Sequence, residues 1–359
     1  MWSFIKDFFI YGFASVLGKI AAIFLMPIYT NILTKEEYGA MALITACKGI
    51  IDLISNLNIH SGIARDYYEP GVNRKKLVST GILSILSISC TVLIILLLTR
   101  YYWLTSVLGL NTIYMLPFVV MLVSIPAGSS LSYFAIMTRF ERKSVKYSIG
   151  TILQLIVQIS ISIYGVVVLQ AGIVSIFAGI LLGEFTGIIY FGYINRNNIG
   201  FIFEWKYLKR ALLFSIPTLP AILAGWIDSS MGQILIGKYV SQTQLGIYSV
   251  ALQFASVFTL VSVALNNVWG PYLYENYKHE NFNKDIKVLY TFILIVLIVI
   301  SINISLLSEE LIILFSNNTY VEASKYLTLL CIPMSIYLLF PIANSGISIS
   351  RDTKYTGIA

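Results

Sequence analysis

Long apolar runs alternate with short polar segments along the whole chain. Ten of these runs reach about 20 residues, the length that an α-helix needs to cross the hydrocarbon core of a bilayer. They cover residues 8–30, 40–63, 77–99, 112–136, 147–169, 172–194, 211–236, 247–270, 288–307 and 325–348. The pattern predicts an all-α integral membrane protein with ten spanning helices.

Composition and charge fit the same class of protein. The 359 residues are 57% hydrophobic and 11% charged, whereas a soluble domain has about 25% charged residues. The net charge of +7 could favour nucleic acid, but the basic residues are scattered through short loops beside the predicted spans. Basic loops of this kind are typical of the cytoplasmic side of a membrane. We therefore expect a cytoplasmic amino terminus and no nucleic-acid partner.

The chain contains an internal repeat. ILTKEEYGAMALITA (residues 32–46) pairs with YVSQTQLGIYSVALQ (residues 239–253), at an offset of about 207 residues. Three further pairs follow in order at a nearly constant offset: NLNIHSGIARDYYE with SVALNNVWGPYLYE, LVSIP with LLCIP, and RKSVKY with SRDTKY. The repeat predicts two homologous lobes, an arrangement that transporters use to build a central site.

The offset covers six predicted helices, so the two lobes should share one orientation about an axis along the membrane normal. The first lobe, residues 1–206, contains six predicted helices, and the second lobe, residues 207–359, contains four. We expect a twelve-span architecture whose second lobe is incomplete, lacking about 50 residues by the length that two spans need.

Charged side chains inside predicted spans are costly and usually mark ion pairs or pathways. Five stand out: Lys19, Lys48, Asp52, Glu184 and Asp228. Lys48 and Asp52 are four residues apart and share a helix face, so they can form an internal ion pair that locks the helix to its neighbours. The functional alternative is an anion pocket, because helix geometry places Lys19 and Lys48 at similar depth.

The two carboxylates Glu184 and Asp228 lie one in each predicted lobe. Each could couple transport to H⁺ or Na⁺, or could be a buried acid satisfied by hydrogen bonds. Arg65, at the predicted cytoplasmic end of the second span, could gate entry or bind a lipid phosphate, or could simply anchor the topology. The second lobe has Pro271 at the aligned position, so any such role belongs to one lobe.

Several amides also fall within predicted spans. They are suited to lining a hydrated cavity, and the alternative is hydrogen bonding between helices. The amides are Gln154, Gln158, Gln253, Asn266 and Asn267.

Motifs for enzymatic chemistry are missing. The sequence has no GxxxxGK[ST] loop and no HExxH spacing, and its only histidines are His60 and His279. Cys47, Cys90 and Cys331 all fall in predicted spans, where they act as small hydrophobic residues. The short loops leave no room for a soluble catalytic domain. We therefore expect a transporter, with no metal or organic cofactor, and no enzyme.

The amino-terminal sequence resembles a known family. FIKDFFIYGFASVLGKIAAIFLMPIYTNILTKEEYGAMALI, with Pro27 and the turn TNILTKEEYG, is similar to the start of polysaccharide-specific members of the multidrug/oligosaccharidyl-lipid/polysaccharide (MOP) exporter superfamily. The WGPYLYE segment of the second lobe is similar to the same branch. The resemblance covers essentially the whole chain, although its motifs are diffuse. The sequence departs from the family pattern only in lacking the last pair of spans.

This resemblance implies a Wzx-type flippase of the bacterial inner membrane. Such a protein moves undecaprenyl-pyrophosphate-linked oligosaccharide from the inner to the outer leaflet, for O-antigen or capsule, by alternating access. Its partners would be the lipid-linked oligosaccharide, membrane lipids, and polysaccharide polymerase and chain-length proteins.

In that case Lys19, Lys48 and Arg65 would attract the pyrophosphate, Asp52 would tune Lys48, and Glu184 or Asp228 would bind the coupling cation. The alternative within the superfamily is a cation-coupled multidrug or metabolite exporter. A membrane-embedded glycan transferase is the alternative from another class.

Overall fold

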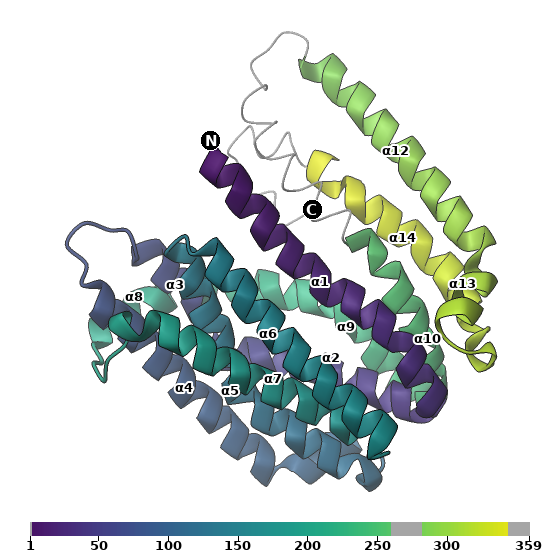
Figure 1. Cartoon of the computed structure of the whole chain (residues 1–359), viewed down its shortest axis with the longest axis horizontal. Helices are drawn as coiled ribbons and strands as arrows, with labels where there is room; N and C mark the ends of the chain where they lie inside the picture. The colour runs from purple at the N-terminus through teal and green to yellow at the C-terminus, as the bar shows by residue number, and fades with distance from the viewer. Residues whose placement is uncertain (1, 260–281, 344–359) are drawn as a thin grey trace. The chain divides into compact units, whose positions relative to one another are not determined.

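A computed structural model describes residues 2–259 and 282–343. Within these ranges the chain is helical and forms no strand. The α-helices, with the labels of Figure 1, are α1 (Trp2–Ile32), α2 (Lys35–Asn56), α3 (Ile59–Asp66), α4 (Arg74–Leu98), α5 (Met115–Phe140), α6 (Ser144–Ile163), α7 (Ile173–Asn195), α8 (Trp205–Ser215), α9 (Leu219–Tyr239), α10 (Gln242–Ala255), α12 (Phe282–Leu306), α13 (Ser308–Phe315) and α14 (Ala323–Ala343). Short 3₁₀ or π turns, η1 (Tyr102–Val107), η2 (Thr112–Tyr114), η3 (Tyr164–Val168), η4 (Arg196–Asn198), η5 (Ile216–Thr218) and η6 (Asn318–Tyr320), extend or connect them.

The helices confirm the all-α membrane class. Among the described residues, seven helices are long and apolar enough to cross a membrane, and the segments Leu17–Ile32 and Ala323–Ile336 are shorter apolar helices. Most of each predicted span falls on helix where the structure describes it. The later parts of the spans 247–270 and 325–348 lie outside the described residues.

The second predicted span, residues 40–63, is wrong as a single helix. α2 ends at Asn56, and Leu57 and Asn58 adopt left-handed backbone angles (φ 44° and 51°) before α3 begins. The Asn58 amide donates to Thr218 Oγ1 at 2.8 Å. Thr218 ends η5, where the predicted span 211–236 is also interrupted. The two breaks are therefore bridged by side chains that supply hydrogen bonds beyond the helical ones.

The chain packs as two compact units. The first comprises Met1–Gly18 and Ile32–Gly246, and the second comprises Lys19–Asn31 and Ile247–Ala359, so α1 and α10 contribute to both. These units are defined by packing, whereas the predicted lobes are defined by the sequence repeat. The lobe boundary at residue 206 therefore stays a prediction.

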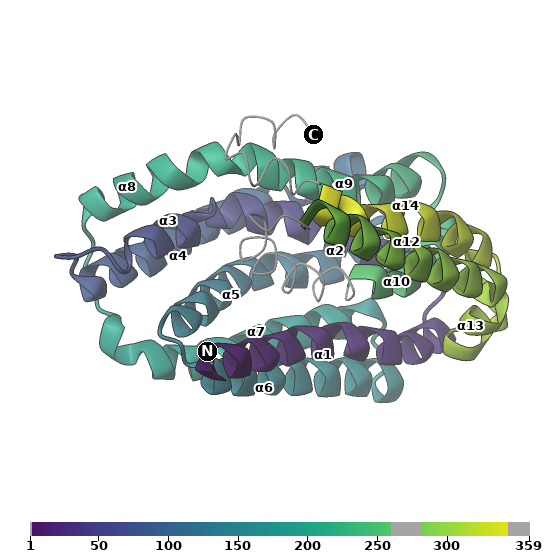
Figure 2. The same ribbon diagram turned by 90° about the horizontal axis from the view of Figure 1, so that it is seen from above.

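In the first unit, α7 packs against both α5 and α6, and α4 packs against α5 (Figure 2). Glycines let α6 and α7 approach closely: a Cβ on Gly179 would lie 2.6 Å from the carbonyl oxygen of Gln158. Around Tyr133 and Phe191, a cluster of buried apolar side chains joins α3, α4, α5, α7 and α8. This core fixes α7, which carries Glu184, and α3, which carries Asp66, against their neighbours.

In the second unit, α14 packs against α12 and α13. Aromatic side chains contact edge to face, Tyr248 with Tyr326 and Phe254 with Phe315, at centroid distances of 5.8 and 6.0 Å. These pairs tie α10 to the helices that follow it in the same unit.

The amino-terminal turns of α2 and α10 cross in close contact at two glycines of the first unit. A Cβ on Gly39 would lie 2.0 Å from the carbonyl oxygen of Gln242, and a Cβ on Gly246 would lie 2.1 Å from that of Lys35. Gly39 and Gly246, like Lys35 and Gln242, occupy equivalent positions of the repeat. The contact is therefore reciprocal between equivalent positions of the repeat, and the relation of the two predicted lobes stays a prediction.

Candidate functional site

Three charged side chains meet inside the first unit. The ammonium nitrogen of Lys48 lies 2.9 Å from Asp52 Oδ2 and 3.3 Å from Glu184 Oε1. The side chains of Lys48 and Glu184 are 12% and 8% exposed. Lys48 and Asp52 are on α2, one turn apart, and Glu184 is on α7. The expected Lys48–Asp52 ion pair is present, and the structure adds a second carboxylate to it.

A glycine lets a third helix reach this ion cluster, which we define as Lys48, Asp52 and Glu184. Gly128 of α5 lies against it, because a Cβ there would be 2.8 Å from Glu184 Oε1 and 3.1 Å from Lys48 Nζ. α2, α5 and α7 all pack against one another. The charges are therefore enclosed by helix contacts, with no space for a side chain at residue 128 unless they move.

The ion cluster holds two carboxylates against one ammonium group. Asp52 Oδ1 and Glu184 Oε2 are buried and accept no hydrogen bond from the part of the chain that the structure describes. With all three groups ionised, the net charge is negative by one unit. Buried charge without full compensation is costly, so this arrangement can accept a proton or a small cation. The described residues contain no group of three His, Cys, Asp or Glu side chains suited to a metal ion.

Lys19 belongs to the second unit, where its half-buried ammonium group donates to Thr259 Oγ1. Lys48 belongs to the first unit. The expected convergence of these two ammonium groups at one anion site stays a prediction.

The other predicted site residues are distributed as follows. Asp228 is exposed on α9. Gln154 and Gln158 are half-buried on α6, on the side where α7 packs. Gln253 is half-buried on α10. Asn266 and Asn267 lie outside the described residues, and the cavity role of all these amides stays untested.

Arg65 is held by a second group of charges. Its Nε donates to Asp66 Oδ1 at 3.1 Å, and its guanidinium lies 5.1 Å from the ring centre of Phe214. Arg210 of α8 binds the other oxygen of Asp66 at 3.1 Å and also Glu69 at 2.6 Å. The Asp66 side chain is 1% exposed. Arg65 therefore contacts α8 through Phe214. Its roles toward phosphate and as a topology anchor both stay predictions.

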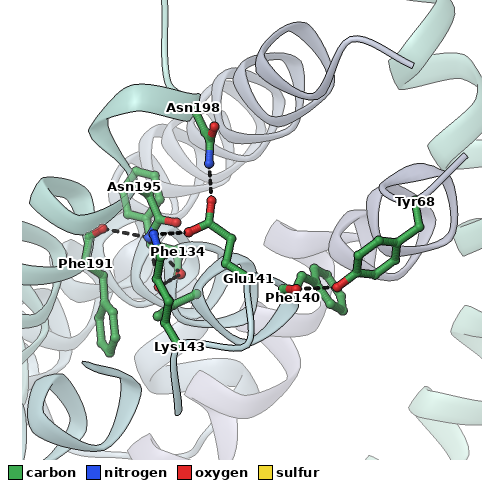
Figure 3. A network of polar contacts seen from close by, with 9 residues as sticks. Tyr68, Phe134, Phe140, Glu141, Lys143, Phe191, Asn195 and Asn198 are labelled. Carbon is green, nitrogen blue, oxygen red and sulfur yellow. Dashed lines mark hydrogen bonds and ion pairs between the residues drawn. The ribbon is translucent and has the colours of Figure 1, made fainter. Parts of the chain in front are cut away.

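Polar side chains also tie the loop after α5 to the end of α7 (Figure 3). The Asn195 amide donates to the carbonyl oxygens of Phe191 at 2.8 Å and Phe134 at 3.4 Å. The Asn198 amide donates to Glu141 Oε1. Asn195 is buried, so these bonds fix the ends of α5 and α7 relative to each other.

The turn between α3 and α4 is bound to the same loop. The Tyr68 hydroxyl donates to the carbonyl oxygen of Phe140 (Figure 3). Arg74 donates to the carbonyl oxygen of Tyr67 at 3.3 Å and lies 5.2 Å from the centre of its ring. Burial raises the pKa of the Tyr67 phenol, and the carboxylate of Glu141 raises it further. Sequence reasoning missed this network, because its donors and acceptors are far apart along the chain.

Solved structures with the same fold are transporters. An inward-facing multidrug resistance MATE family transporter of the MOP superfamily is 14% identical and has a TM-score of 0.71, with 92% of this chain and 80% of that chain covered. A mutant of the Vibrio cholerae MATE transporter VcmN is 13% identical, with a TM-score of 0.61 and coverage of 95% and 83%. An outward-facing MATE transporter is 14% identical, with a TM-score of 0.61 and coverage of 96% and 82%.

At these identities the likeness shows the fold, which is that of multi-pass membrane transporters. No curated protein matches the sequence. A family model described as "Polysaccharide biosynthesis protein" matches residues 4–277. Because this match covers well over half of the chain, the chain belongs to the polysaccharide biosynthesis protein family.

Proposed function

We propose that the protein is a flippase that moves undecaprenyl-pyrophosphate-linked oligosaccharide from the inner to the outer leaflet of a bacterial inner membrane. Family membership supports a polysaccharide precursor as the substrate, and the transporter fold supports alternating access. The observation that carries the proposal is the ion cluster, in which a buried ammonium group is held between two carboxylates. Such a group can change partners when the charge around it changes.

The charge balance of the ion cluster gives a coupling mechanism. When H⁺ or Na⁺ binds to Asp52 or Glu184, one carboxylate is neutralised and Lys48 keeps a single anionic partner. The ammonium group is then available to a phosphate oxygen of the substrate. When the cation leaves, both carboxylates attract Lys48 again and the phosphate is released. Lys19, in the second unit, is the other proposed phosphate ligand, and Asp228 is the alternative coupling acid.

A second candidate function is the export of a cationic drug or metabolite coupled to a cation. The excess of carboxylate in the ion cluster favours it, because an anionic pocket attracts cations. The two functions predict different effects on substrate binding when the Lys48 ammonium group is removed. Removing this ammonium group should abolish an anion site, whereas it should leave a cation site more negative and still able to bind.

The leaflet distribution of lipid-linked oligosaccharide tests the proposal. In cells lacking the full-length gene, the lipid should accumulate on the cytoplasmic leaflet, and re-expression should return it to the outer leaflet. Lys48→Ala and Lys19→Ala should impair this rescue without preventing membrane insertion. Lys146→Ala removes an exposed lysine at the start of α6 and serves as the matched control.

Two results would count against the proposal. If deletion leaves the leaflet distribution unchanged, the lipid-linked substrate is wrong and the exporter becomes the leading function. If the double variant Lys19→Ala/Lys48→Ala still rescues fully, the lysines do not bind the pyrophosphate, even though the transport function stands.

A further inference from the structure

The short helix α8 is amphipathic, and one of its faces is fully used inside the first unit. Leu208, Ala211 and Ser215 are buried at helical spacing, and α8 packs against α3 and α4. The approach to α3 is close, since a Cβ on Gly62 would lie 2.5 Å from the carbonyl oxygen of Ala211. The opposite face of α8 is exposed.

The exposed face changes character along the helix. Trp205, Lys206 and Lys209 lie near its amino-terminal end, and Leu213 and Ile216 lie at and beyond its carboxyl-terminal end. Seven residues separate Lys209 from Ile216, about 10 Å at 1.5 Å per residue. This order of aromatic, cationic and apolar side chains matches the change from lipid headgroup to acyl chain at a membrane surface.

A shallow groove of about 240 Å³ follows this face of α8. Its lining consists of Trp205, Lys209, Leu212, Leu213, Ile216 and Pro217. Apart from the Lys209 ammonium group, the lining is apolar or aromatic. The groove therefore has one cation beside an otherwise apolar wall.

The two lysines of this face lack anionic partners among the described residues, because the neighbouring acids are already occupied. Glu204 binds Lys76 at 2.6 Å. Glu69 binds Arg210, which also binds Asp66. Lys206 and Lys209 are exposed and join none of these ion pairs. Two ammonium groups are thus free for an external anion.

We propose that this groove binds an anionic glycerophospholipid of the bilayer. Its phosphate contacts Lys206 and Lys209, and one acyl chain lies along Leu213 and Ile216. The apolar wall favours a phospholipid over free phosphate, since the wall contributes binding only when the phosphate carries a chain. The fully exposed ring of Phe201, just before α8, supplies an aromatic side chain of the kind enriched at membrane surfaces. This inference is independent of the transported substrate.

Lipid titration of the purified full chain tests the site. The protein in a neutral detergent is titrated with phosphatidylglycerol or phosphatidylcholine, and bound lipid is counted by native mass spectrometry. Lys206→Gln/Lys209→Gln should weaken phosphatidylglycerol binding about 30-fold and each single variant about fivefold, as expected for two lysines near an anionic lipid. The matched control, Lys146→Gln/Lys287→Gln, removes the same charge from two exposed lysines on the same predicted side of the membrane.

The outcomes separate the alternatives. The inference holds if phosphatidylglycerol binds more tightly than phosphatidylcholine and only the α8 variant loses this preference. It is overturned if both double variants lose binding equally, because the attraction is then diffuse. It is also overturned if inorganic phosphate or a polyprenyl pyrophosphate competes fully while phosphatidylglycerol does not bind.

Because the lysines are exposed and unpaired, a loss of fold is not expected. Leu213→Ser, which leaves both charges in place, checks the acyl-chain contact by a separate loss of lipid binding.

Discussion

Lys48→Met should destabilise the protein far more than the loss of an exposed lysine. The substitution nearly keeps the length of the side chain and removes the only cation of the ion cluster, which leaves the buried carboxylate of Glu184 and the half-buried carboxylate of Asp52 without it. At an effective dielectric constant near 20, the lost attractions are about 6 kcal/mol at 2.9 Å and about 5 kcal/mol at 3.3 Å. Desolvation of the charges in the folded protein offsets part of this attraction, and breaking one partner from a buried ion pair costs about 3–5 kcal/mol in net stability.

The assay is thermal unfolding in detergent, followed by the loss of helical signal. We expect the midpoint of Lys48→Met to fall by roughly 10 °C. Lys48→Met/Asp52→Asn/Glu184→Gln should recover most of this loss, since it removes the buried charges together while preserving side-chain shape. Lys146→Met is the control for loss of a lysine. The reasoning is refuted if Lys48→Met unfolds like this control, or if the triple variant is no more stable than the single one.

Three further predictions concern other contacts. Gly39→Ala should lower the stability of the protein by about 1–3 kcal/mol, because the new Cβ forces α2 and α10 apart. The control Gly225→Ala has open space around residue 225 and should not destabilise the protein. Equal unfolding midpoints for the two variants would contradict the close crossing. Arg210→Ala should lower the unfolding midpoint because it leaves the buried Asp66 carboxylate short of a partner. Arg65→Ala, whose side chain is 47% exposed, should lower it less, and the reverse order would contradict this geometry. Tyr133→Phe should cost about 1 kcal/mol, because it removes a buried hydrogen bond of 2.9 Å to the carbonyl oxygen of Val78; an unchanged midpoint would show that this bond adds nothing net.

The helices could be predicted from the sequence because each span must bury its own backbone polar groups in an apolar run of sufficient length. The break at Leu57 and Asn58 could not be predicted in this way, since neither residue is Gly or Pro. The hydrogen-bond partner of Asn58 there, Thr218, is distant in sequence. In contrast, the spacing of four residues along one helix is enough to predict the contact between Lys48 and Asp52.

Its place in a predicted span marks Glu184 as a candidate coupling site or buried acid, but its position beside Lys48 depends on how α7 packs against α2. The same limit applies to Asp66 and Arg210, whose pairing follows from the contact of α3 with α8. Local spacing reports neighbours on one helix, and it contains no information on which helices meet.

The crossing of Gly39 with Gly246 also bears on how such a chain can arise. Reciprocal contacts between equivalent residues are what an isologous homodimer makes across its two-fold axis. A half-length ancestor would have met a second copy of itself here, and any substitution would have acted twice. Fusion of the two copies into one gene releases this constraint, so the two sides can change separately. On this account Lys35 on one side and Gln242 on the other would be the result of such a divergence, with the glycines at the centre still matched.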